Sequence, residues 1–162
     1  MPDNHFLTDL PLAGDLVSED FDGWPEWLKT EFDEHANDGH VGSRLLSQNA
    51  RVRVWEIRLA PGQRWHAHRH VLDYFWTAVT PGRSLQHTFD GTTREVTYLT
   101  GQTRHFHFGR GEYLLHDIEN IGDTDLVFTT VEHLAAPTRR CPSAQTPAPG
   151  IHGRDHRRND DS

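Results

Sequence analysis

The chain has 162 residues, which is enough for one domain with a sizeable hydrophobic core. Sixteen lysines and arginines against twenty-four aspartates and glutamates give a formal net charge of −8, and this balance argues against a nucleic-acid-binding surface, which needs clustered basic residues. The single cysteine, Cys141, can form no intrachain disulfide, so a disulfide-based scaffold is excluded and a reducing compartment is expected.

The N-terminal part of the chain is expected to lie outside the main domain. Residues 1–20 show few periodic apolar positions and no basic segment followed by an apolar run, so we predict an extended arm without a secretory signal or membrane anchor, in a cytoplasmic protein. Residues 22–36 are predicted to be a short helix, because Pro25 fits a first turn and Leu28 and Phe32 share an apolar stripe. We expect this helix to pack on the outside of the domain.

From about residue 41 the hydrophobic pattern changes to a period of two, which is typical of β-strands. Turn signals such as Pro61-Gly62 and Asp90-Gly91 separate short alternating runs, spaced roughly 8–12 residues apart. This pattern predicts an antiparallel β-sandwich or barrel. We expect strands at 51–59, 64–70, 73–80, 83–89, 92–99, 104–108, 113–118 and 126–134.

These patterns divide the chain into three parts. We predict an arm and a short helix over 1–40, a β-domain over 41–135 and a C-terminal tail over 136–162. The tail is rich in proline, serine, glycine and charged residues and offers almost nothing to bury, so we expect it to be disordered.

The residues with the clearest chemistry lie in the predicted strand 64–70. His66, His68 and His70 occupy alternate positions, and Asp73 follows three residues later. Side chains two residues apart in a strand point to the same side, so all three imidazoles are expected to share one face. Neutral imidazole and carboxylate groups bind Fe(II), Mn, Ni, Cu and Zn, so this stretch indicates a site for a divalent transition metal.

The order of these residues resembles the two sequence motifs of the cupins, which are small double-stranded β-helix barrels. The first motif has a glycine, five residues, His-x-His, an acidic residue and a later glycine, and the second has a histidine after a glycine turn and an asparagine four residues on. The matching residues here are Gly62, His68, His70, Asp73 and Gly82 for the first motif, and Gly109, Gly111, His116 and Asn120 for the second.

The resemblance covers roughly residues 50–134 and is strongest to small bacterial cupins associated with β-alanine degradation. It implies an all-β, cupin-type jelly-roll barrel, here with a short N-terminal helix. It also implies a metal held by His68, His70, Asp73 and His116. Small cupins are commonly dimers, so a homodimer is expected.

Two features depart from the cupin pattern. The gap from His70 to Asp73 is two residues, where the family has three or four. Pairing His66 with His68 would restore that gap but would leave three residues instead of five after Gly62, so we prefer His68 and His70. Asp73 also stands where glutamate is usual, and its shorter side chain leaves two alternatives, a fourth ligand or a site of three histidines.

Further histidines are candidates for moving protons near neutral pH, with His66 and His105 assigned this catalytic role. His105 and His107 share one face of their strand, and the intervening phenylalanines share the other. Either face could line the barrel.

The aromatic run after Asp73 is predicted to alternate between the barrel interior and the outside. If Asp73 points inward, Tyr74 and Trp76 point outward and need cover from the arm, the helix or a second subunit.

Three functions fit this interpretation. We predict first a non-haem Fe(II) dioxygenase acting on a small organic molecule, because histidine ligands leave coordination positions open for substrate and O₂. The second is a lyase, isomerase or hydrolase that uses Zn, Ni or Mn as a Lewis acid and needs no oxygen. The third is a non-catalytic cupin that binds a small ligand with support from the metal. No nucleic-acid or membrane partner is expected.

Overall fold

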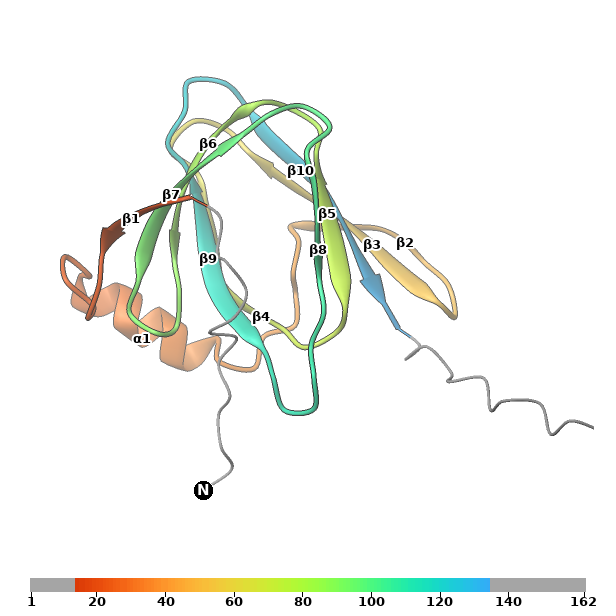
Figure 1. Ribbon diagram of the computed structural model, residues 1–162, viewed down its shortest axis with the longest axis horizontal. Helices are drawn as coiled ribbons and strands as arrows, with labels where there is room; N and C mark the ends of the chain where they lie inside the picture. The colour runs from red at the N-terminus through yellow and green to blue at the C-terminus, as the bar shows by residue number, and fades with distance from the viewer. Residues whose placement is uncertain (1–13, 135–162) are drawn as a thin grey trace, which may run out of the picture.

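The computed structural model describes residues 14–134, which form two antiparallel five-stranded sheets and one helix (Figure 1). The strand orders are β1-β7-β6-β9-β4 and β2-β3-β10-β5-β8. The predicted antiparallel all-β fold is therefore confirmed. The strands are β1 (Asp15–Ser18), β2 (Arg44–Gln48), β3 (Val52–Leu59), β4 (Arg64–His70), β5 (Tyr74–Ala78), β6 (Gly82–His87), β7 (Thr93–Tyr98), β8 (Thr103–Phe106), β9 (Leu114–Asn120) and β10 (Leu126–His133), and the helix is α1 (Glu26–Glu34).

Two edge strands were not predicted separately. β1 pairs with β7 although it falls where an extended arm was expected, and β2 pairs with β3 at the edge of the other sheet. Every residue of β2 is exposed, and β1 is exposed apart from a half-buried Ser18, so neither strand carries the alternation that identifies a half-buried strand. The predictions for residues 1–13 and 136–162 lie outside the described residues.

Helix α1 covers the outer face of the sheet that contains β4 and β9 (Figure 1). It begins after Pro25, whose extended backbone ends the preceding segment, and it is shorter than the predicted 22–36. Leu28 and Phe32 are buried against Ala67 of β4 and Leu115 of β9. The predicted external packing of the helix is thus confirmed. No helix within residues 14–134 is long and apolar enough to cross a membrane.

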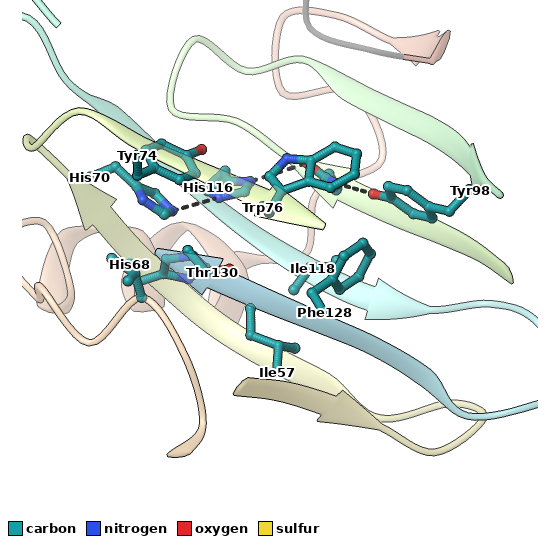
Figure 2. A pocket seen from close by; sticks show the side chains of 12 residues that line it. Ile57, His68, His70, Tyr74, Trp76, Tyr98, His116, Ile118, Phe128 and Thr130 are labelled. Carbon is teal, nitrogen blue, oxygen red and sulfur yellow. Dashed lines mark hydrogen bonds between the residues drawn. The ribbon is translucent and has the colours of Figure 1, made fainter. Parts of the chain in front are cut away.

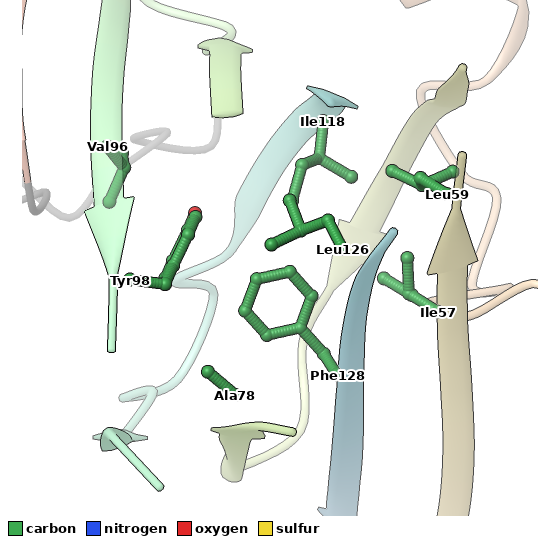
Figure 3. Packing of buried hydrophobic residues seen from close by; sticks show 8 residues of the cluster. All are labelled: Ile57, Leu59, Ala78, Val96, Tyr98, Ile118, Leu126 and Phe128. Atoms are coloured by element: carbon green, nitrogen blue, oxygen red, sulfur yellow. The ribbon is translucent and has the colours of Figure 1, made fainter. Parts of the chain in front are cut away.

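The apolar core fills the space between the two sheets (Figure 3). Five of its members also line the cavity described below, so the core forms one wall of that cavity: Ile57, Val96, Tyr98, Ile118 and Phe128. The remaining members of the cluster are Leu59, Ala78 and Leu126.

Asn120 sets the register between β4 and β9. Its side-chain amide donates to the carbonyls of Leu59 and Thr124, both at 2.8 Å, and its backbone carbonyl accepts from Gly62 N at 2.8 Å. Gly62 has φ +81°, a left-handed conformation that favours glycine at this turn. These contacts join the turn before β4 to the end of β9, and the resulting register places His68 opposite His116.

Candidate metal centre

Three histidines from two adjacent strands meet inside the barrel (Figure 2). His68 and His70 come from β4 and His116 from β9, and one ligand nitrogen of each lies within 4.8 Å of the others. The Nε2 atoms of His70 and His116 are 3.2 Å apart. His68 and His70 are 1% and 3% exposed, so the group is shielded from bulk water.

Hydrogen bonds and ring stacking orient the three imidazoles. His68 Nδ1 donates to the His66 carbonyl at 2.8 Å, and His116 Nδ1 donates to Gln86 Oε1 at 3.1 Å. Because Nδ1 carries the proton in both rings, each Nε2 keeps a lone pair. The His70 ring stacks on Tyr74 with centroids 4.1 Å apart. The free Nε2 lone pairs of His68 and His116, together with the fixed ring of His70, form an arrangement that suits a metal ion.

The three rings are held in the neutral form that metal binding requires. Burial lowers the pKa of His68 to about 4, against the opposing hydrogen bond to the His66 carbonyl. Burial, together with the neighbouring histidines, also places the pKa values of His70 and His116 well below the usual range. Buried His70 Nδ1 has no hydrogen-bond partner among the described residues, so these residues leave the hydrogen-bonding capacity of one ring nitrogen in the cluster unused. The donor set fits a divalent metal.

Acidification should destabilise the metal-free protein. The pKa of His68 is about 4 in the folded state and near 6.5 when unfolded, so the unfolded chain binds the proton first. The contribution of His68 to stability is therefore complete above pH 6.5 and is lost as the pH falls toward 4. Its loss should lower the free energy of unfolding by roughly 2–3 kcal/mol between pH 7 and 4.5. Urea denaturation at both pH values measures this, and His68→Gln should flatten the dependence.

The histidines open into a cavity between the sheets. One lobe contains all three histidines, and a second lobe adjoins it at His116; in each, the space open to the centre of a water-sized sphere is about 40 Å³. Both lobes are bounded by Tyr74, Trp76, Gln86 and Tyr98. A volume of this size has room for a few water-sized groups, so each lobe can hold only a compact ligand.

Comparisons with known proteins identify this architecture. No protein-family model and no curated protein sequence matches the chain. Among solved structures, a cupin domain from Bordetella pertussis is 29% identical with a TM-score of 0.51, and the alignment covers 61% of this chain and 97% of that one. The chain has the cupin fold. The antiparallel two-sheet barrel with an external helix is therefore the double-stranded β-helix that the two motifs predicted.

Two further similar structures have lower scores. A protein with a double-stranded β-helix domain from Klebsiella pneumoniae is 19% identical, with a TM-score of 0.46 and coverage of 62% of this chain and 84% of that one. An RmlC-like cupin family protein from Methanocaldococcus jannaschii is also 19% identical, with a TM-score of 0.45 and coverage of 56% and 76%. The resemblance to cupins of β-alanine degradation stays a prediction.

The aromatic residues of β5 face the cupin cavity, contrary to the orientation derived from an inward Asp73. Tyr74 is 2% exposed, and both Tyr74 and Trp76 line the cavity. Alternation then turns Phe75 and Thr77 to the outer side. Asp73 precedes the strand and lines neither lobe, so the assumption of an inward Asp73 does not hold.

Asp73 is not brought to the three histidines. Its carboxylate accepts hydrogen bonds from Phe108 N at 2.8 Å and from His107 Nδ1 at 3.3 Å. Burial opposes ionisation of Asp73, but these hydrogen bonds outweigh it and lower the pKa of the carboxyl group. Asp73 therefore ties the start of β5 to the segment after β8, and the site matches the three-histidine alternative.

His66 leaves the inner face because β4 contains a bulge. Trp65 pairs with Ile118 and His68 with His116, so three steps along β4 oppose two along β9. The ring of His66 lies outside the cupin cavity, 4.3 Å from the ring of His35. Its ring joins His35 and Asp38 in a separate group, so the expected shared face of three imidazoles is wrong for His66.

His105 also lies outside the cavity. It is exposed and packs on the ring of Phe75 on the outer side of the sheet, with ring centroids 5.2 Å apart. Phe106, by contrast, is buried inside the barrel against Tyr74. The phenylalanine face of β8 therefore lines the barrel. Neither lobe includes either proposed proton-transfer histidine, His66 or His105.

Gln86 and Tyr98 are site residues that sequence reasoning did not identify. Gln86 Nε2 donates to the Tyr98 hydroxyl at 2.6 Å, while its Oε1 holds His116. The structure turns Ser84 and Gln86 of β6 inward, where Gln86 lines the cavity and its Nε2 donates to Ser84 Oγ at 3.3 Å. The sequence shows that Gln86 is polar, but it does not show that this residue faces the cavity.

Proposed function

We propose that this protein is a metal-dependent cupin enzyme, specifically an Fe(II) dioxygenase that acts on a small organic molecule. The observation that supports this most directly is the set of three neutral imidazoles, two of them buried, that converge on the cavity between the sheets. Histidine is a ligand for Fe(II), Zn, Ni and Mn, and Fe(II) is our first choice.

His68, His70 and His116 would hold the metal. When bound, Fe(II) would supply the redox chemistry by which O₂ reacts with a substrate at the remaining coordination positions. Three protein ligands leave such positions free, whereas structural sites are closed by four. The dominance of aromatic and aliphatic residues in the cavity wall would limit access of water to the reacting groups.

The residues around the histidines would keep the site in one geometry. Gln86 links His116 to Tyr98, and the Tyr98 hydroxyl is also 2.8 Å from Ser84 Oγ. Burial raises the pKa of Tyr98 to about 12, so this hydroxyl stays protonated at neutral pH and is available as a donor. The stack of His70, Tyr74 and Phe106 fixes the opposite side.

Oxygen consumption by full-length protein reconstituted with Fe(II) tests the proposal. With a panel of small organic acids, alcohols and amines, we expect uptake of O₂ with at least one substrate, loss of uptake in His116→Gln and retention in His105→Gln. Turnover that continues under strict anaerobiosis, or with Zn in place of Fe(II), would instead identify a lyase, isomerase or hydrolase. Ligand binding without turnover under either condition would identify a binding protein.

A homodimer and a cytoplasmic location also remain proposals. The exposed Leu45 and Leu46 on edge strand β2 support association with a second copy, because an unpaired strand edge with apolar side chains favours pairing. Sedimentation equilibrium of the full chain tests the dimer, and fractionation of cells tests the location.

A further inference from the structure

Two arginines enter the second lobe of the cavity from opposite sheets. Arg94 lies on β7, in line with Val96 and Tyr98, which face the interior. Arg104 lies on β8, opposite Trp76 and in line with buried Phe106. Both side chains are partly buried, and both line the lobe that also contains His116.

Neither guanidinium has a carboxylate partner within residues 14–134. Two other partly buried arginines do, since Arg53 meets Glu132 at 3.3 Å and Arg64 meets Glu31 at 3.0 Å. The Nε atom of Arg94 is buried and makes no hydrogen bond to the described residues. Arg104 lies 5.5 Å from the ring of Phe106, a contact that leaves its in-plane N–H donors available.

The cavity is positive although the chain is acidic. The protein has a formal net charge of −8, yet no aspartate or glutamate lines either lobe. A guanidinium presents its donors in a planar fork that matches the two oxygens of a carboxylate. Two such groups in a partly desolvated lobe therefore select a small anion. Because His116 lines both lobes, an anion bound there would lie beside the three histidines.

We propose that Arg94 and Arg104 form the binding site for the carboxylate of a small organic acid, whose second oxygen-bearing group faces His116 and the adjoining histidines. This rests on the proposed function, because it names the substrate class of the same cavity. The space open to the centre of a water-sized sphere is about 40 Å³ in this lobe, which restricts the ligand to a compact mono- or dicarboxylate. The two arginines are thus specificity-determining residues.

Calorimetric titration of the metal-loaded full-length protein with malonate tests this site. We expect Arg94→Gln and Arg104→Gln each to weaken malonate binding by roughly ten- to a hundredfold, since each removes a charge-assisted hydrogen-bonding group. Arg94→Lys should retain part of the affinity because it keeps the charge. Arg58→Gln is the matched control: Arg58 is 54% exposed and lines neither lobe, so this variant should bind malonate normally.

The outcomes separate the site from the function on which it rests. Malonate binding that is absent, or equal in wild type and both glutamine variants while the metal is retained, would overturn the arginine site alone. Arginine-dependent malonate binding in a protein that takes up no metal would support the site and remove the metal-dependent enzyme. Inorganic phosphate is titrated in parallel, and phosphate binding tighter than that of malonate would overturn the carboxylate assignment.

Discussion

Replacing His68 and His70 together with glutamine will remove the bound metal from the full-length protein. These residues supply two of three converging imidazoles, and both are almost completely buried, so no other described donor is positioned to replace them. Loss of an outer-sphere partner alone weakens metal binding by about 10- to 100-fold, and loss of two direct ligands should exceed that. Elemental analysis after dialysis, with calorimetric titration of the metal, measures the change.

Two single-histidine controls make this result specific. His105→Gln changes an exposed residue on the outer face and should leave both metal content and affinity unchanged. His66→Gln tests the alternative pairing of His66 with His68, and retention of the cavity metal in that variant supports the pair His68 and His70. Full metal content in the double variant, with its fold verified by circular dichroism, would eliminate the centre proposed here.

Arg64→Met should lower the free energy of unfolding by about 3–5 kcal/mol, which is the cost expected when one partner of a buried ion pair is removed. Arg64 joins helix α1 to the barrel, because its guanidinium donates to Glu31 of the helix and to Asp117 of β9. Asp117 is 0% exposed, and without Arg64 the hydrogen bonds left to its carboxylate within residues 14–134 are those from His87. Urea denaturation of the full chain measures the loss.

Comparison with exposed sites distinguishes the buried pair from ordinary surface charge. Arg58→Met removes contacts of 3.6 and 3.7 Å at a side chain that is 54% exposed, so its effect should stay within about 1 kcal/mol. If Arg64→Met fails to fold, Glu31→Gln, which removes only the partly exposed partner, gives a smaller measurable loss. Equal effects of Arg64→Met and Arg58→Met would show that the buried pair does not anchor the helix.

Most of the barrel could be predicted from sequence because the determining signals are local. Turn residues such as Gly62 have a backbone preference that does not depend on distant contacts, and period-two alternation identifies strands that are half-buried. Strands β1 and β2 were missed for the same reason, since they lie on sheet edges with mostly exposed side chains and show no alternation.

The metal-site histidines were also accessible from sequence, but their neighbours were not. His68, His70 and His116 stand at fixed spacings from glycine turns, and the register of β4 with β9 brings them together. Gln86 and Arg94 carry no such spacing signal. Their roles depend on which partner lies across the barrel, and that partner is distant in the sequence.

The sequence by itself determined the strands, the turns and the relative sides of residues within a strand, because these follow from bonds and backbone sterics over a few residues. Only the tertiary structure decided which side faces the cavity. The bulge in β4 removes His66 from the inner face, the contact with Phe108 draws Asp73 away, and the inward side of β8 proved to be that of Arg104. Each of these outcomes depends on pairing and burial between segments that are distant in the sequence. Alternation within one strand cannot decide them, because the pattern is the same whichever face points inward.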